Sequence, residues 1–169
     1  MSRLVALALV VLSGCLPAQP RLALETEPPF DVFAFFQGET AGLGVLHIRG
    51  RAPVPVEVES VGTVLESGDL ELVQTITRGD DEPYQRTWTF RALGDGRYTG
   101  DLTEATGPVE AEASGNRLVI GYRTGRFTTV SQTLALQPGG RLALNLLSVR
   151  VLGVPVARLT EQIRRVEDE

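Results

Sequence analysis

Apolar and polar residues alternate along most of this chain, which is the pattern of half-buried β-strands. In the segment 54–65, Val56 and Val58 share one face, while Glu57 and Glu59 share the other. Clusters of turn-forming residues, such as Gly94-Asp95-Gly96, separate the alternating segments. The pattern predicts strands over residues 43–49, 54–65, 70–78, 84–93, 97–104, 109–113, 117–123, 127–136, 141–149 and 156–166.

Strands at this even spacing, with no long helix between them, exclude a parallel α/β fold and favour an antiparallel meander. A sandwich would leave edge strands, whereas a closed barrel removes them. We therefore predict an all-β fold, an antiparallel up-and-down barrel of about eight to ten strands. Residues 31–36 fit either one helical turn with Asp31 near its start or a strand that plugs the fold. The last segment also fits a helix through Leu159, Ile163 and Val166, and we prefer a strand.

The first fifteen residues have the features of an export signal. Arg3 precedes an apolar run of nine residues, Leu4 to Leu12, which is too short to span a membrane as a helix. The next residues, Leu12-Ser13-Gly14-Cys15, look like the lipobox of bacterial lipoproteins. The Cys15 thiol would take a diacylglyceryl group as a thioether, and cleavage would fall between Gly14 and Cys15. The prediction is a signal peptide over residues 1–14, a lipidated cysteine with a proline-rich tether over 15–29, and one barrel domain over 30–169.

The alternative is a soluble secreted protein cut after Ala18. Pro17 and Pro20 flank that bond and make it a poor cleavage site, and a single cysteine cannot form an intramolecular disulfide. Two or three acyl chains would hold the protein firmly on a bilayer. In a Gram-negative host, Leu16 rather than Asp after the cysteine predicts the periplasmic face of the outer membrane.

The composition excludes several kinds of chemistry. All 16 basic residues are arginine, so neither a Schiff-base lysine nor a P-loop lysine is present. One histidine, His47, and one cysteine cannot form a Cys/His metal cluster, and we predict no metal ligands, no cofactor and no catalytic residues. The net charge of −5 argues against nucleic acid as a partner. The same charge indicates that acyl chains, not a basic patch, would hold the protein on an anionic membrane.

One strand carries the candidate ligand site. Tyr84, Arg86, Trp88 and Phe90 share a face that we expect to point inward. A buried, unpaired arginine is very costly, so Arg86 needs an acid such as Glu104 or Asp101, or an acidic ligand. One hypothesis is that Arg86 binds a carboxylate or phosphate while the aromatic rings pack an acyl tail. In the other interpretation, Arg86 lies at the barrel mouth and pairs with an acid of a neighbouring strand. Tyr98 and Tyr122 complete the predicted site.

Several short motifs along the domain resemble those of a known family. They are Phe35-Phe36-Gln37-Gly38, Arg86-Thr87-Trp88, Tyr98-Thr99-Gly100, Gly107, Gly115-Asn116 and Tyr122. With the lipobox, they resemble an uncharacterised family of bacterial lipoproteins, the domain of unknown function number thirty-eight thirty-three. The resemblance implies a lipocalin-like barrel on a lipid anchor and implies no activity. Glu104 stands where an Asp is expected, and 128–131 lacks the Asp-Asp-Trp segment of the family.

Three functions remain open. The favoured hypothesis is a non-enzymatic envelope lipoprotein that binds a lipid or another apolar ligand in the barrel. An alternative is a structural or protein-interaction module with a filled barrel, and a weaker one is a lipid-modifying enzyme that uses Arg86, Glu104 and Asp101. A lipid site should be mostly apolar and exceed roughly 300 Å³, and the enzyme requires its three residues to converge.

Overall fold

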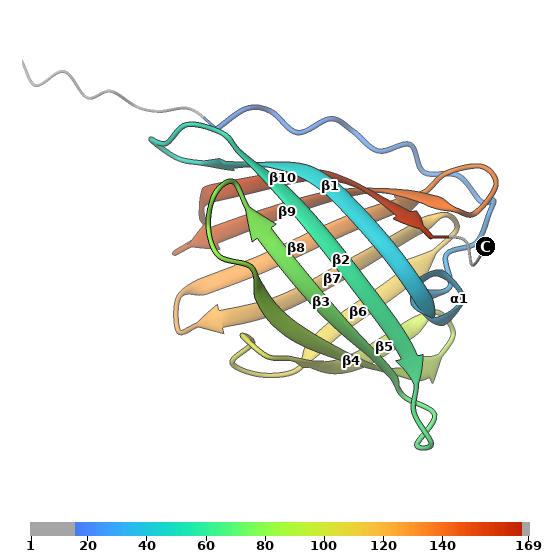
Figure 1. Ribbon diagram of the computed structural model, residues 1–169. Helices are drawn as coiled ribbons and strands as arrows, with labels where there is room; N and C mark the ends of the chain where they lie inside the picture. The colour runs from blue at the N-terminus through green and yellow to red at the C-terminus, as the bar shows by residue number, and fades with distance from the viewer. Residues whose placement is uncertain (1–15, 167–169) are drawn as a thin grey trace, which may run out of the picture.

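The computed structural model describes residues 16–166, which form a closed barrel of ten antiparallel strands (Figure 1). The strands are β1 (Gly38–Ile48), β2 (Val54–Val64), β3 (Leu70–Arg78), β4 (Tyr84–Gly94), β5 (Arg97–Leu102), β6 (Val109–Ser114), β7 (Arg117–Gly125), β8 (Thr128–Leu136), β9 (Leu142–Val151) and β10 (Val154–Arg165). Each strand pairs with the next one in the sequence, and β10 returns to pair with β1. The predicted all-β, up-and-down, lipocalin-like barrel is confirmed. Gly14 and Cys15, and with them the predicted cleavage and lipidation, lie outside the described residues.

Alternating burial explains why these segments form strands. In β3, Leu70, Leu72, Gln74 and Ile76 are buried, and the residues between them are half-buried. β1 begins at Gly38, five residues before the predicted start at residue 43. Its first inward positions are Thr40 and Gly42, which lack the apolar side chains that the alternation pattern requires. The final segment is the strand β10, as preferred above.

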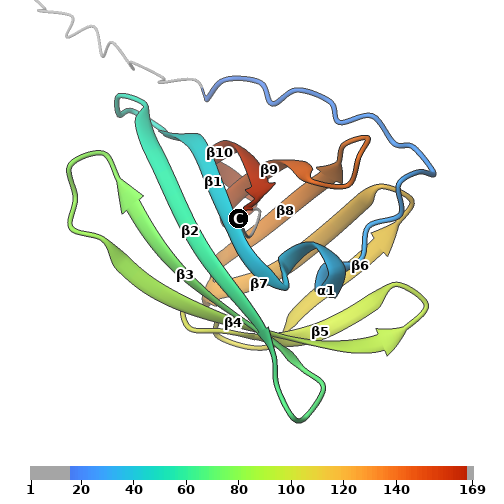
Figure 2. The same cartoon turned by 45° about the vertical axis from the view of Figure 1, so that its right-hand side comes forward.

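One end of the barrel is closed by a short helix, α1 (Val32–Phe36), which lies across the opening (Figure 2). The Asp31 carboxylate accepts a hydrogen bond from the Ala34 N–H at 2.9 Å, which is the expected N-cap contact. Of the two alternatives for this segment, the helical turn with Asp31 at its start is therefore correct. Phe35 and Phe36 are buried and pack with Phe30.

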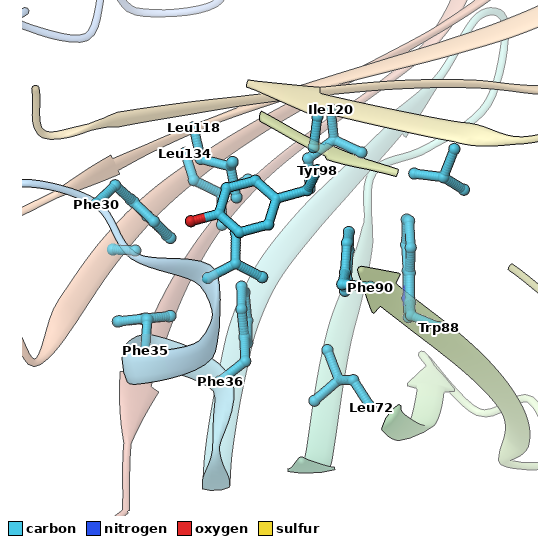
Figure 3. Packing of buried hydrophobic residues seen from close by; sticks show 14 of the residues in the cluster. Phe30, Phe35, Phe36, Leu72, Trp88, Phe90, Tyr98, Leu118, Ile120 and Leu134 are labelled. Atoms are coloured by element: carbon cyan, nitrogen blue, oxygen red, sulfur yellow. The ribbon is translucent and has the colours of Figure 1, made fainter. Parts of the chain in front are cut away.

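Large apolar side chains fill the barrel behind α1, and Figure 3 shows their packing. The cluster includes Phe30, Phe35, Phe36, Leu72, Phe90, Leu118 and Leu134. Trp88 stacks on Phe90 with ring centroids 5.6 Å apart, and Tyr122 meets Trp88 edge-on at 5.3 Å. This closed end is a packed core. The opposite end, which we call the mouth, is ringed by the turns β1–β2, β3–β4, β5–β6, β7–β8 and β9–β10.

The segment 16–29 is extended and runs along the outside of the barrel (Figure 1). Near β9 and β10, the Gln19 side chain donates to the carbonyls of Leu147 and Leu159 at 3.0 and 3.2 Å. At the closed end, Glu25 and Asn116 exchange hydrogen bonds of 3.0 and 2.8 Å. The predicted tether is thus bound to the domain from near the mouth to the closed end. Within residues 16–166, no helix is long and apolar enough to cross a membrane.

Candidate functional site

A cavity of about 370 Å³ lies inside the barrel, between the packed core and the mouth. Most of its wall is aliphatic or aromatic. The apolar lining includes Leu46, Val56, Val58, Ile76, Ile120, Val130, Leu147, Val149 and Leu159. The volume exceeds the lower bound expected of a small-molecule site, and a barrel filled to native packing density would leave no such space. The cavity therefore weighs against the filled-barrel module.

Six of the seven predicted ligand-binding residues line this cavity. They are Tyr84, Arg86, Trp88, Phe90, Glu104 and Tyr122. Tyr98 does not line it, because the inward face of β5 at this position lies at the closed end, where the Tyr98 ring stacks 6.3 Å from Phe33. Tyr98 is thus placed in the core rather than against the cavity.

Arg86 lies inside the barrel and is paired. Its Nε donates to Gln74 Oε1 at 2.9 Å, and its guanidinium lies 3.7 Å from the Glu104 carboxylate. The same guanidinium lies over the Trp88 ring, 5.2 Å from the centroid. Arg86 thus faces the cavity and pairs with an acid near the mouth, and its binding of a ligand stays a prediction. Asp101 is exposed and close enough to the outward-facing Arg91 to affect it electrostatically, so Arg86, Glu104 and Asp101 do not converge.

The inner wall also carries a ring of polar side chains, which we call the polar belt. Its members are Ser60, Gln74, Arg86, Tyr122, Gln132, Asn145 and Glu161, from seven strands. Gln74 connects three of its neighbours: Oε1 accepts from Arg86 and from Trp88 Nε1, the latter at 2.7 Å, and Nε2 donates to Ser60 Oγ at 3.1 Å. On the other side, Asn145 Nδ2 donates to Glu161 Oε2 at 2.8 Å and to Gln132 Oε1 at 3.3 Å. Polar groups thus surround the inner part of an otherwise apolar cavity.

Sequence reasoning missed five members of the polar belt: Ser60, Gln74, Gln132, Asn145 and Glu161. The signal was present, because each replaces an apolar residue at an inward position of its strand. Gln74 lies between Leu72 and Ile76 on one face, and Glu161 lies between Leu159 and Ile163. A polar residue that interrupts a buried, period-two face requires a partner inside the protein or a ligand.

Glu161 is the most deeply buried acid of the site, with 5% of its surface exposed. Space for its side chain comes from β1, because a Cβ atom added at Gly42 would lie 2.2 Å from Glu161 Oε1. Burial raises the pKa of the Glu161 carboxyl, and this effect is opposed by the Asn145 hydrogen bond and the positive charge of Arg86. Burial likewise raises the pKa of the Tyr122 hydroxyl, opposed by Arg86 and Gln132. The deep part of the site thus favours uncharged groups.

The buried carboxyl gives a pH-dependent prediction. Because the pKa of Glu161 is higher in the folded than in the unfolded chain, its protonated form stabilises the fold fully below the unfolded value of 4.5. This contribution is lost as the pH rises from 4.5 through the native pKa, at about 1.4 kcal/mol for each unit between the two values. We expect Glu161→Gln to be more stable than the native protein at neutral pH, with a difference that vanishes below pH 4.5. Urea unfolding at several pH values measures it.

The matched control is Glu112→Gln, which removes an exposed glutamate from the outer face. A Glu161→Gln effect that stays constant across the pH range would contradict the prediction.

The histidine and most of the acids of the described chain lie outside the cavity. His47 is half-buried on β1 and faces outward opposite Arg158, and Asp80, Asp81 and Glu82 are exposed in the β3–β4 turn. Glu57, Glu59, Glu110 and Glu112 are exposed on strand faces. Within residues 16–166 there is no group of three histidines, cysteines or acids that could hold a metal ion.

Solved structures with the same barrel architecture are distant in sequence. The S-type phycobiliprotein lyase CPES from Guillardia theta superposes with a TM-score of 0.64 at 8% identity, over 79% of this chain and 89% of the lyase. A protein of unknown function of the DUF3598 family from Nostoc punctiforme has a TM-score of 0.62 at 16% identity, over 83% of this chain, which spans 51% of that protein. Rv2717c from M. tuberculosis has a TM-score of 0.56 at 15% identity, over 78% and 93% of the two chains. At these identities, the likeness shows the fold alone.

No curated protein matches this sequence. A family model, by contrast, matches residues 9–164, which includes every strand of the barrel except the last residue of β10. The barrel, its cavity and the motifs around Phe36, Trp88 and Tyr122 all lie within this match. The chain therefore belongs to the family described as protein of unknown function DUF3833.

Proposed function

We propose that this protein is a lipid-anchored envelope protein that binds an amphipathic ligand, such as a lipid, inside its barrel without chemically altering it. The anchor would be acyl chains on Cys15, and the location the periplasmic face of a Gram-negative outer membrane. The apolar run from Leu4 to Leu12 and the lipobox residues that follow it support the anchor. The cavity supports the binding role.

One observation carries the ligand-binding proposal. Asn145 Oδ1 is buried and has no hydrogen-bond partner within the described residues, although it lies in a cavity with apolar walls. A buried acceptor without a partner costs about 1–3 kcal/mol, so such atoms are rare unless something else binds to them. A ligand hydroxyl, amide or protonated carboxyl that donates to Asn145 Oδ1 beside Glu161 would satisfy this atom.

The arrangement also gives the ligand a direction. On β3, β9 and β10, the inward positions next to the polar belt on its mouth side are apolar: Ile76 follows Gln74, Leu147 and Val149 follow Asn145, and Leu159 precedes Glu161. Arg78 and Thr124 line the cavity closer to its rim. The polar group of the ligand would therefore lie at the belt, and its apolar part would extend toward the mouth. Arg86 would contact an acidic group only by competing with Glu104 for it.

Native mass spectrometry of the protein extracted from its own membrane tests both parts of the proposal. We expect covalent acyl mass at Cys15 and a released non-covalent ligand. Ala157→Phe places a large ring in the cavity near the mouth and should abolish binding of a fluorescent long-chain fatty acid. Ala41→Phe makes the same change at an exposed position of β1 and should leave binding unchanged. A protein without acyl mass would overturn the anchor, and equal binding by the two variants would overturn the cavity site.

A further inference from the structure

Two neighbouring turns at the mouth expose apolar side chains. Phe127 precedes β8 and is 54% exposed, and Leu152, between β9 and β10, is 72% exposed. The turns are joined by a hydrogen bond of 3.0 Å from the Leu152 N–H to the Phe127 carbonyl, and Val151 and Val154 extend the same apolar surface. We call Phe127, Val151, Leu152 and Val154 the mouth tip. Contiguous exposed apolar residues of this kind mark interaction surfaces.

The backbone conformation of Leu152 at the mouth tip is unfavourable for a leucine. Its φ of 51° lies in the left-handed region, which L residues other than Asn and Asp adopt at a cost. At the closed end, the β4–β5 hairpin places Asp95-Gly96 at φ values of 53° and 71°, which is the preferred kind of residue pair for such a turn. The β9–β10 hairpin has the same geometry, with φ values of 51° and 80°, but carries Leu152-Gly153. The exposed leucine is thus unfavourable both for the turn and for solvation.

The segments that carry the mouth tip have charge of one sign. Between Glu112 and Glu161 the sequence contains no acidic residue, and its arginines toward the mouth are Arg123, Arg126, Arg150 and Arg158, whereas Arg117 and Arg141 lie at the closed end. The Arg126 guanidinium lies over the Phe127 ring, 5.1 Å from its centroid. In the part of the chain that the structure describes, neither Arg126 nor Arg150 forms an ion pair. Apolar side chains flanked by unpaired arginines are complementary to the surface of an anionic bilayer.

The path of the chain agrees with this orientation. Arg158, near the mouth end of β10, donates a hydrogen bond to the carbonyl of Pro17. Leu16, the first described residue, therefore lies toward the mouth rather than toward α1 (Figure 1). Residue 15 directly precedes Leu16 in the chain, so an anchor on residue 15 would attach beside the mouth.

We propose that the mouth tip docks into the headgroup region of a bilayer containing anionic phospholipid, so that the cavity opens toward the membrane. The orientation of the cavity toward the membrane rests in part on the proposed anchor, whereas the docking of the mouth tip does not depend on the anchor. The acidic β3–β4 turn lies across the mouth from the tip and would stay in water, so the barrel axis would tilt. A ligand could then pass between bilayer and cavity without crossing bulk water.

Tryptophan quenching by brominated lipids in reconstituted vesicles tests this orientation. Phe127→Trp places a probe on the mouth tip, and Leu93→Trp places a matched probe at an equally exposed apolar position of the closed end. In vesicles that contain phosphatidylglycerol, we expect strong quenching at residue 127 and only the baseline of the buried Trp88 at residue 93. Equal quenching at both positions, or none at 127, would overturn the proposal. A concentration-dependent emission shift at 127 without vesicles would assign the tip to a second copy of the chain instead.

Leu152→Asn separates docking from folding. Asn favours the left-handed turn, so the variant should unfold at the same or higher urea concentration, while most of the quenching at residue 127 is lost. If the purified protein carries no acyl mass, the proposed anchor is wrong, but the docking of the mouth tip can still be tested. The unacylated protein should then float with phosphatidylglycerol vesicles and not with phosphatidylcholine vesicles, and failure to float with either would overturn the docking surface.

Discussion

Trp88→Ala is expected to lower the free energy of unfolding by about 3–5 kcal/mol. Trp88 is 3% exposed, stacks on Phe90 and meets Tyr122 edge-on, so its removal leaves a void between the core and the cavity. Its indole N–H also donates to Gln74 at 2.7 Å, and losing this bond loosens the polar belt. Urea unfolding followed by far-ultraviolet circular dichroism measures the change.

Phe127→Ala is the matched control, because it removes an aromatic ring that is 54% exposed. We expect this variant to change the stability by less than about 0.5 kcal/mol. If the two substitutions had similar effects, Trp88 would not hold the wall of the cavity together.

Gly62→Ala is expected to destabilise the protein by about 1–3 kcal/mol through overpacking, although it adds only one methyl group. A Cβ atom at residue 62 would lie 1.9 Å from the carbonyl oxygen of Phe36. Because this contact is with backbone, α1 has to move as a unit away from β2. Thermal unfolding measures the loss, and faster amide hydrogen exchange at Phe35 and Gln37, which donate within the α1 turn, localises it.

Gly121→Ala controls for the effect of alanine in a strand, since no atom lies within 4 Å of a Cβ built there. We expect its stability to equal or slightly exceed that of the native protein. Unchanged hydrogen exchange at α1 in Gly62→Ala would show that the position of α1 does not depend on this close approach.

The barrel was predictable from the sequence because its strands obey one simple rule. Inward positions are apolar and outward positions are polar, as in Val56 and Glu57, and turn residues mark nearly every reversal. The face that carries Arg86, Trp88 and Phe90 was therefore placed inward correctly. Tyr98 follows the same rule, but alternation gives only the face of a residue and not its height along the barrel, so its separation from the cavity could not be foreseen.

The polar belt escaped prediction for a different physical reason. Its members are isolated polar residues in apolar faces, and the alternation pattern alone does not show which of these side chains bond to one another across neighbouring strands. Asn145 and Glu161 meet across the β9–β10 ladder, whereas Gln132 joins them from β8. The course of segment 16–29 along the barrel was equally invisible, because its hydrogen bonds from Gln19 and Glu25 join groups more than 90 residues apart.

The pairing of β1 with β10 has a consequence for biosynthesis. Gly44 lies opposite Glu161, so the ring of strands cannot shut until nearly the whole chain has left the ribosome. Ladders of such high contact order form slowly, over milliseconds to seconds. The strands nearest the N-terminus thus emerge long before their last partner, β10, is available. The topology delays closure of the barrel until synthesis of the chain is nearly complete.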